Sequence, residues 1–265
     1  MKNVLFWPHP AFGTLAGIGL GVTTALVLPT SSQAALFADV MPDYWAADYI
    51  SALADRDILN GYTDGTFRPE SAVTRAEFAA ILSKAFPTAE SFGATGGFID
   101  VPADYWGYGA INTARATGFL SGYPSNEFRP EQSIPRVQAL VSLANGLDYT
   151  SDNLNALTYY IDAAAIPSYA RASIAAATQA EIVVNYPTRT QLQPSRNASR
   201  AEVAAFVYQA LVQAGEAEPL AATPYVVDVQ AADWSTTPIA TLPTRAEQLS
   251  LSRDSTRVAT LRQET

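Results

Sequence analysis

Apolar residues recur along this chain at three- and four-residue spacings, the period of a helix that is buried on one side. The first stripe comprises Trp45, Tyr49, Ile50, Leu53 and Ala54. A second stripe comprises Phe78, Ile81, Leu82, Ala85 and Phe86. Between the two stripes, Asp64-Gly65 predicts a tight turn, and Pro69 stops any helix from continuing. The pattern therefore predicts two helices that are joined by a loop.

The ends of these helices carry their own sequence features. Thr74-Arg75-Ala76-Glu77 predicts a capping box, in which the Thr74 hydroxyl accepts from the Glu77 amide and the Glu77 carboxylate accepts from the Thr74 amide. Gly61 follows the first stripe and is expected to end that helix in the left-handed conformation, which costs Gly little.

This helix–loop–helix unit occurs three times in the sequence. Adding 61 to the number of Phe37, Trp45 or Arg75 gives the same residue type in a second copy. A third, less regular copy contains Tyr160-Ile161-Asp162, Asn185-Tyr186-Pro187, Gln193-Pro194 and Ser199-Arg200-Ala201-Glu202. Repeats of this kind bury their apolar faces against one another, which predicts a mainly α-helical repeat protein.

The copies differ at positions that matter for capping and for turns. Pro135 stands where the first copy has Thr74, so the second copy loses its side-chain cap. The third copy regains the capping box with Ser199 and Glu202, but its Trp position falls in Ser168-Tyr169. Asn185 replaces the Gly of the first two copies. We therefore expect the third copy to retain the fold and to lose ligand contacts.

The three copies resemble the S-layer homology (SLH) family. The match rests on the opening Phe-x-Asp-Val, the Tyr-Trp six residues later, the Gly-Tyr, the Gly-x-Phe-x-Pro and the Thr-Arg-Ala-Glu, and it covers about residues 37–212. The resemblance implies three helix-loop-helix repeats packed around a pseudo-threefold axis. It also implies binding of acidic cell-wall polysaccharide, often pyruvylated, or of a peptidoglycan-linked polymer, in grooves between repeats.

The resulting domain organisation has five parts. We expect a signal peptide at 1–35, SLH repeats at 36–97, 98–159 and 160–215, and a poorly structured tail at 216–265. Lys2, the apolar stretch 15–28 and Ser32-Gln33-Ala34 favour cleavage and export to the cell envelope, in the cell wall or the periplasm. An uncleaved membrane anchor is the alternative for residues 11–28. Asp228-Val229, Trp234 and Thr244-Arg245-Ala246-Glu247 indicate a degenerate fourth half-repeat within the tail.

Composition then narrows the chemistry. The chain contains no Cys, and its one His, His9, lies in the signal segment. The expected mature chain therefore offers neither His-based acid–base chemistry nor the usual zinc ligands, and we expect no cofactor and no metal. Without Lys2 it has 15 basic and 25 acidic residues, a formal charge of −10, which argues against nucleic acid as a partner. Of these basic residues only Lys84 is a lysine; the others are Arg, which suits recognition of carboxylates.

Arg75, Arg136 and Arg200 are candidate ligand-binding residues, because a basic residue occupies this position in all three copies. Near a helix amino-terminus, their side chains would share partial positive charge that favours anions. The alternative is that each Arg only pairs with a nearby carboxylate at the helix start. From the completeness of each copy, we expect Arg75 to matter most for binding, Arg136 next and Arg200 least.

Aromatic and turn residues complete the candidate ligand site. Trp45 and Trp106 are candidates to stack on sugar faces, although their place on the apolar stripe favours core or groove wall. Gly61-Tyr62 and Gly122-Tyr123 each place a phenol hydroxyl after a turn, where it can point at a ligand. Three further acidic residues recur, and we expect them to cap the segments that follow them: Asp39, Asp100 and Asp162.

No spacing of carboxylates singles out a catalytic pair, so the sequence favours a non-catalytic protein that binds a wall polysaccharide. Two alternatives remain open. One is an envelope scaffold whose repeats bind protein partners or self-assemble, and the other is a wall-modifying enzyme with an unrecognised carboxylate site. A membrane contact is expected only through the signal segment, if that segment is not cleaved.

Overall fold

The computed structural model describes residues 37–89, 97–221 and 223–229, all of which belong to one unit, Ala34–Thr265. These residues form α-helices, short 3₁₀-helices and isolated β-bridges, with no regular strand among them. The predicted mainly α-helical fold is therefore confirmed. The expected signal peptide, and the part of the predicted half-repeat beyond Val229, lie outside the described residues.

Each repeat contributes two α-helices, as the apolar stripes predict. They are α1 Ala47–Ala54 and α2 Arg75–Ala85, α3 Tyr108–Ala116 and α4 Arg136–Gly146, and α5 Arg171–Gln179 and α6 Arg200–Gln213. A 3₁₀-helix at Leu154–Tyr159 ends the second repeat, and the third repeat adds two more, at Ala163–Ala165 and Ser168–Ala170. Both predicted capping boxes are present, at Thr74 and Ser199, whereas Pro135 precedes α4 without a side-chain cap.

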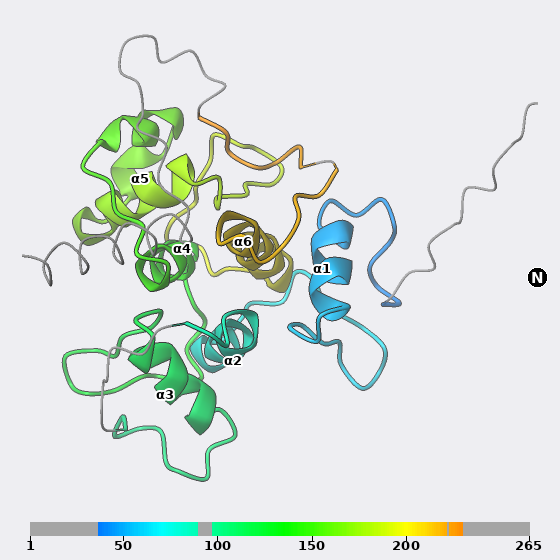
Figure 1. Ribbon diagram of the computed structural model, residues 1–265, viewed down its shortest axis with the longest axis vertical. Helices are drawn as coiled ribbons and strands as arrows, with labels where there is room; N and C mark the ends of the chain where they lie inside the picture. Colours follow the sequence, from blue (N-terminus) through cyan, green and yellow to red (C-terminus); the bar gives the residue numbers. More distant parts are fainter. Residues whose placement is uncertain (1–36, 90–96, 222, 230–265) are drawn as a thin grey trace, which may run out of the picture. The chain divides into compact units, whose positions relative to one another are not determined.

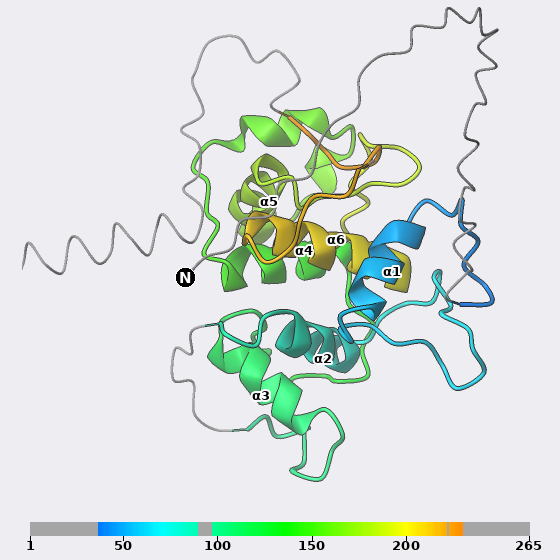
Figure 2. The same ribbon diagram turned by 45° about the vertical axis from the view of Figure 1, so that its right-hand side comes forward.

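The helices of different repeats pack in a cyclic order (Figures 1 and 2). The first helix of each repeat lies against the second helix of the repeat before it: α3 packs on α2 and α5 packs on α4. The order closes because α1 of the first repeat packs on α6 of the third. Each repeat therefore completes the core of its neighbour, as expected of units that cannot bury their apolar faces alone.

A ring of three backbone hydrogen bonds joins the repeats where their second helices begin. The Val73 amide donates to the Ala198 carbonyl over 3.1 Å, the Ala198 amide to Ile134 over 2.9 Å, and the Ile134 amide to Val73 over 2.9 Å. All three side chains are fully buried. Each repeat thus donates to one neighbour and accepts from the other, in agreement with the pseudo-threefold packing expected for this sequence.

The start of the tail packs against the third repeat, and residues 230–265 lie outside the described residues. Val226 forms an antiparallel bridge with Val184, and the Val227 amide donates to the Val183 carbonyl over 2.9 Å. Val227 and Val229 are buried. A tail rich in Ala, Thr and Pro gave no sign of this contact, because a short extended segment needs only a few apolar side chains to pack.

Candidate functional site

The three candidate Arg side chains lie inside the junctions between repeats. We call these junctions 1/2, 2/3 and 3/1, after the repeat that supplies the Arg and the repeat that receives it. Nε donates to a backbone carbonyl of the next repeat in every case: Arg75 to Phe128 over 2.7 Å, Arg136 to Leu192 over 2.7 Å and Arg200 to Phe67 over 2.8 Å. The exposed fractions of Arg75, Arg136 and Arg200 are 4%, 1% and 8%, so all three are buried. All three therefore hold the repeats together, and none is a simple surface ion pair at a helix start.

The same hydrogen bonds fix the position of these carbonyl groups in each copy. Asp39 accepts from the amides of Phe67 and Arg68, both over 2.7 Å. Asp100 accepts in the same way from Phe128 and Arg129, and Asp162 from Leu192 and Gln193. The expectation that these carboxylates cap the following segment is wrong, since each one fixes a loop about thirty residues further along the chain.

The two Gly positions serve a different purpose from the predicted one. Among the described Gly residues, positive φ occurs at Gly65, Gly118 and Gly215 and not at Gly61 or Gly122, so the left-handed assignment is wrong. A Cβ at Gly61 would instead overlap the Phe37 ring and lie 2.8 Å from the Thr66 carbonyl oxygen. The first helix ends in left-handed backbone four residues earlier, at Asp57. Gly61 is thus needed for close packing of the aromatic ring.

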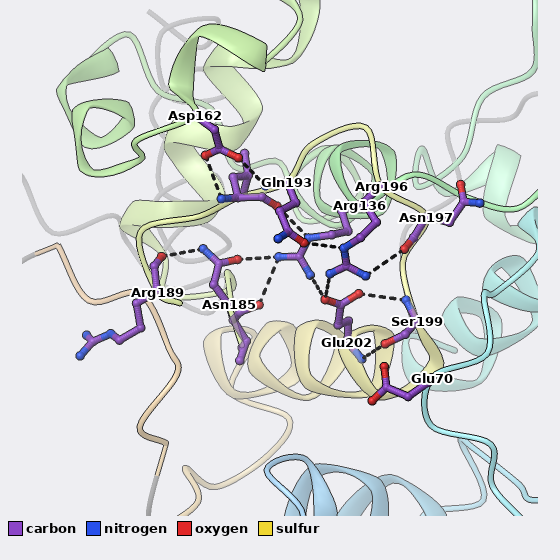
Figure 3. Close-up of polar contacts among 12 residues, drawn as sticks. Glu70, Arg136, Asp162, Asn185, Arg189, Gln193, Arg196, Asn197, Ser199 and Glu202 are labelled. Carbon is purple, nitrogen blue, oxygen red and sulfur yellow. Dashed lines mark hydrogen bonds and ion pairs between the residues drawn. The ribbon is translucent and has the colours of Figure 1, made fainter. Parts of the chain in front are cut away.

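Junction 2/3 contains a closed network of charges (Figure 3). Arg136 pairs with Glu202 through Nη1, and its Nη2 donates to the Asn185 side chain over 2.5 Å. Glu202 pairs with Arg196 as well, while its other oxygen accepts from the Ser199 amide. Burial lowers the pKa of the Arg136 guanidinium, and the Glu202 carboxylate opposes that change. The charge of Arg136 is therefore neutralised inside the fold.

Junction 1/2 lacks such a partner. Arg75 donates to the Ser121 carbonyl over 2.8 Å and, through Nη1, to the Gln138 side-chain oxygen over 3.3 Å. Gln138 occupies the helix position that Glu202 holds in the third repeat. No ion pair of Arg75 occurs among the described residues, and burial lowers the pKa of its guanidinium. Since Arg stays protonated in proteins, this junction retains a cation without an ion-paired carboxylate, and the Asp100 carboxylate acts on it only from beyond ion-pair distance.

Tyr123 extends the same junction. Its ring lies between Arg129, at 4.0 Å from the guanidinium carbon, and Arg75, at 5.1 Å. The Tyr123 hydroxyl is buried, and no described residue forms a hydrogen bond with it. A buried hydroxyl without a partner costs free energy, so a hydrogen bond to this atom would be favourable if a ligand reached it.

Junction 3/1 resembles junction 1/2 because its Arg side chain also lacks an ion pair with a described carboxylate. Arg200 donates to the Asn60 carbonyl over 2.8 Å, and within the described part of the chain it has no carboxylate partner. Tyr62 lies between Arg68 and Arg200, at 4.0 and 5.1 Å. Unlike Tyr123, Tyr62 is exposed.

The two candidate Trp residues differ in their surroundings. Trp106 is 63% exposed, so a place in the core is wrong for this residue, and its ring centroid lies 5.5 Å from that of Tyr105. The neighbouring Gly107 faces Ala76, where a Cβ would lie 3.7 Å from that of Ala76, next to Arg75. Trp45 is half-buried, and Tyr186 stacks on it with ring centroids 5.0 Å apart. Only Trp106 therefore offers an open indole beside a junction.

Sequence reasoning missed the part played by Gln138 and Glu202. The sequence indicates only a capping role for both, because the Arg partners they contact lie more than sixty residues away. The difference was nonetheless visible in the alignment of copies, where Glu77, Gln138 and Glu202 share one position. In the described part of the chain, no group of three or more His, Cys, Asp or Glu side chains could hold a metal ion. No described helix has the length and apolarity needed to cross a membrane.

Comparison with known proteins agrees with this architecture. The model of the S-layer homology domain matches residues 36–79, 97–140 and 160–204, together about half of the chain. Each match covers the start of a repeat through the beginning of its second helix, which is the part that forms the junctions.

Several known proteins are similar to this chain over long stretches. An amylopullulanase of Thermoanaerobacterium thermosulfurigenes is 34% identical over 65% of the chain, and the exoglucanase XynX of Acetivibrio thermocellus is 32% identical over 78%. A cellulosome-anchoring protein of Acetivibrio thermocellus is 33% identical over 42% of the chain. The matches span only 9%, 19% and 26% of these relatives.

Relatives that are S-layer proteins, such as EA1 of Bacillus anthracis at 26% identity over 80% of the chain, agree with the exported, cell-envelope location predicted from the sequence. Three matched repeats, their cyclic packing and the buried Arg of each junction lead to one conclusion. The chain belongs to the S-layer homology domain family, whose members bind polymers of the cell wall.

Proposed function

We propose that this chain is a non-catalytic envelope protein that binds an acidic cell-wall polysaccharide, such as a pyruvylated one, or a peptidoglycan-linked polymer at junction 1/2. The observation that carries the proposal is the state of Arg75, a buried cation that contacts two carbonyl oxygens and an amide oxygen but no carboxylate. A carboxylate of the polymer would supply the missing counter-charge.

Two neighbouring groups suit a sugar that carries such a carboxylate. The Tyr123 hydroxyl lacks a partner and can bond to a ligand oxygen. The exposed indole of Trp106 offers an apolar face against which the C–H face of a sugar ring can pack. The expected mature chain has a formal charge of −10, which repels an acidic polymer, so affinity has to come from such local contacts.

This geometry changes the expected order of the three Arg residues. Completeness of the copies predicted Arg75 first, Arg136 second and Arg200 last. Arg136 already forms an ion pair with Glu202, whereas Arg75 and Arg200 form no ion pair with a described carboxylate. We therefore propose that Arg75 contributes most to binding, Arg200 less, and Arg136 only through the stability of the fold.

The comparisons leave room for an enzyme, because two of the relatives described above carry enzyme names. The stretches they share with this chain amount to only 9% and 19% of their lengths, so most of each enzyme has no counterpart in this alignment. Two Glu side chains near the junctions also argue against catalysis. Glu77 and Glu202 each complete a capping box, so their carboxylates are already hydrogen-bonded within the protein. We therefore favour the non-catalytic alternative.

Sedimentation with purified wall sacculi tests the proposal and its alternatives. We expect the chain to sediment with sacculi that carry their attached glycan, and to stay in solution when that glycan has been removed chemically. Binding to stripped sacculi or to other envelope proteins would favour the scaffold, and release of soluble sugar would favour the enzyme. Either result would contradict the proposal.

A matched pair of variants places the site. Trp106→Ala removes the exposed aromatic residue at junction 1/2, and Tyr169→Ala removes one that is equally exposed at the corresponding position of the third repeat. We expect Trp106→Ala to lower the affinity for glycan-bearing sacculi by about tenfold or more, and Tyr169→Ala to leave that affinity unchanged. Equal effects would show that binding does not depend on junction 1/2.

A further inference from the structure

We propose that Tyr186 and Tyr225 cover the indole of Trp45 and thereby keep a second binding site, at junction 3/1, closed. The inference rests on the proposed function, because it concerns which junction is open to the polymer. It makes Tyr186 and Tyr225 residues that determine where this chain binds, and it makes the segment 223–229 a strap over one of two similar sites.

The aromatic contacts show which rings cover the half-buried indole. Tyr186 stacks on Trp45 with ring planes 6° apart, which is the arrangement a flat ligand face would adopt. Tyr225 meets both rings edge-on, at 6.3 Å from Trp45 and 4.8 Å from Tyr186. In contrast, the ring of Trp106 contacts only the adjacent Tyr105 among the described aromatic side chains. The same repeat position is therefore covered at one junction and open at the other.

The sequence of the third repeat explains why Tyr186 is free to cover Trp45. Its counterparts Tyr62 and Tyr123 each lie between two Arg side chains. The third repeat has Gln193 where the first two have Arg68 and Arg129. The other Arg of the set, Arg136, is bound to Asn185 and Glu202. No guanidinium stacks on Tyr186 among the described residues, and its ring packs on Trp45 instead.

Backbone contacts hold Tyr225 in place. Its carbonyl accepts from the Asn185 amide over 3.0 Å, next to Tyr186, and the following residues pair with Val183 and Val184. Val226 and Val227 are buried. The strap is thus attached to the same loop that carries Tyr186, so both rings are positioned together over Trp45.

The covered junction otherwise keeps what an acidic ligand needs. Arg200 is without a carboxylate partner in the described part of the chain, as Arg75 is, and Tyr62 lies against it as Tyr123 lies against Arg75. Helix α1, which begins just after Trp45, packs on α6, which begins with Arg200. Uncovering the indole should therefore give junction 3/1 the same set of groups that junction 1/2 presents.

The test starts from a full-length chain in which Trp106→Ala removes the exposed indole at junction 1/2. In that background we add Tyr186→Ala and Tyr225→Ala together and measure sedimentation with glycan-bearing sacculi. We expect binding to return by about tenfold or more over Trp106→Ala alone, and to disappear again when Trp45→Ala is added. Tyr169→Ala in the same background is the matched control and should restore nothing.

The outcomes separate this inference from the proposed function. If the unmodified chain binds sacculi and the triple variant, folded by circular dichroism, binds no better than Trp106→Ala, the inference is wrong and the proposed function stands. If the unmodified chain does not bind, both are wrong. Should the double Tyr substitution melt below the assay temperature, Tyr186→Ala alone replaces it, since that change removes the stacked ring and leaves the strap residues untouched. A smaller return of binding, still dependent on Trp45, is then expected, and its absence would overturn the inference.

Discussion

Junctions 1/2 and 2/3 are built on the same plan and differ in one decisive residue. In both, an Arg at the start of a helix donates Nε over 2.7 Å to a carbonyl of the next repeat. Nη1 then meets the Gln138 amide oxygen in one junction and the Glu202 carboxylate in the other. One repeat position thus decides whether the cation is neutralised within the protein or remains available to an anion from outside.

This difference should change how much each Arg contributes to stability. Removing one partner of a buried ion pair leaves the other charge without compensation, which typically costs about 3–5 kcal/mol. Removing an Arg that contacts only neutral oxygens leaves buried acceptors unpaired, at about 1–3 kcal/mol.

The largest effect is therefore expected from Arg136→Met, which removes the fully buried partner of Glu202 and leaves only Arg196, whose side chain is 43% exposed and therefore screened by solvent. We expect the free energy of unfolding to fall by about 3–5 kcal/mol, against about 1–3 kcal/mol for the matched variant Arg75→Met. Urea unfolding followed by circular dichroism measures both. Equal losses would mean that the two junctions do not differ in the way described.

Asp100→Ala should have the next largest effect, because it acts on a feature that the junctions share. The change removes the acceptor of the Phe128 and Arg129 amides, and with it the fixed position of the carbonyl that Arg75 contacts. We expect a loss of about 2 kcal/mol in the free energy of unfolding, from hydrogen bonds to a charged group. Asp104→Ala, at a nearby exposed Asp, is the control and should change the urea midpoint little.

A smaller effect is expected from alkaline pH, through Tyr side chains at the junctions. Burial, together with a hydrogen bond to Glu131, raises the pKa of Tyr105 to about 12 from the ordinary value of 10.0. Burial and Glu70 raise the pKa of Tyr44 as well. The unfolded chain therefore ionises first, so stability is complete below pH 10 and is lost as pH rises towards 12.

Urea midpoints at pH 9, 11 and 12 test this expectation, with Tyr105→Phe as the comparison. The midpoint should fall over this range, and it should fall less in the variant, which cannot ionise at that position. A midpoint that is independent of pH up to 12 would contradict the account of these two Tyr residues.

Much of this architecture could be predicted from the sequence. Helical stripes, the capping boxes at Thr74 and Ser199 and the threefold repetition are local patterns, and each appears in the structure. The roles of Gly61 and Asp39 could not be predicted, because they depend on Phe37 and on a loop that only the folded repeat brings close. Likewise, the strap over Trp45 joins residues from the first repeat, the third repeat and the tail.

Exchanging the decisive residue compares the two junctions within one protein. Glu202→Gln gives junction 2/3 the amide that junction 1/2 has, and Gln138→Glu gives junction 1/2 a carboxylate beside Arg75. Both exchanges keep the length of the side chain and its place in the helix, so packing should change little.

The most direct test of the central claim is the affinity of Gln138→Glu for glycan-bearing sacculi, measured alongside its melting temperature. We expect binding to weaken by about tenfold or more, because the new carboxylate neutralises Arg75 and replaces a charge-assisted contact with the polymer that is worth about 1.5–3 kcal/mol. The melting temperature should stay the same or rise. Wall binding at the level of the unmodified chain, in a folded Gln138→Glu variant, would contradict the claim that an unneutralised Arg75 recognises the polymer.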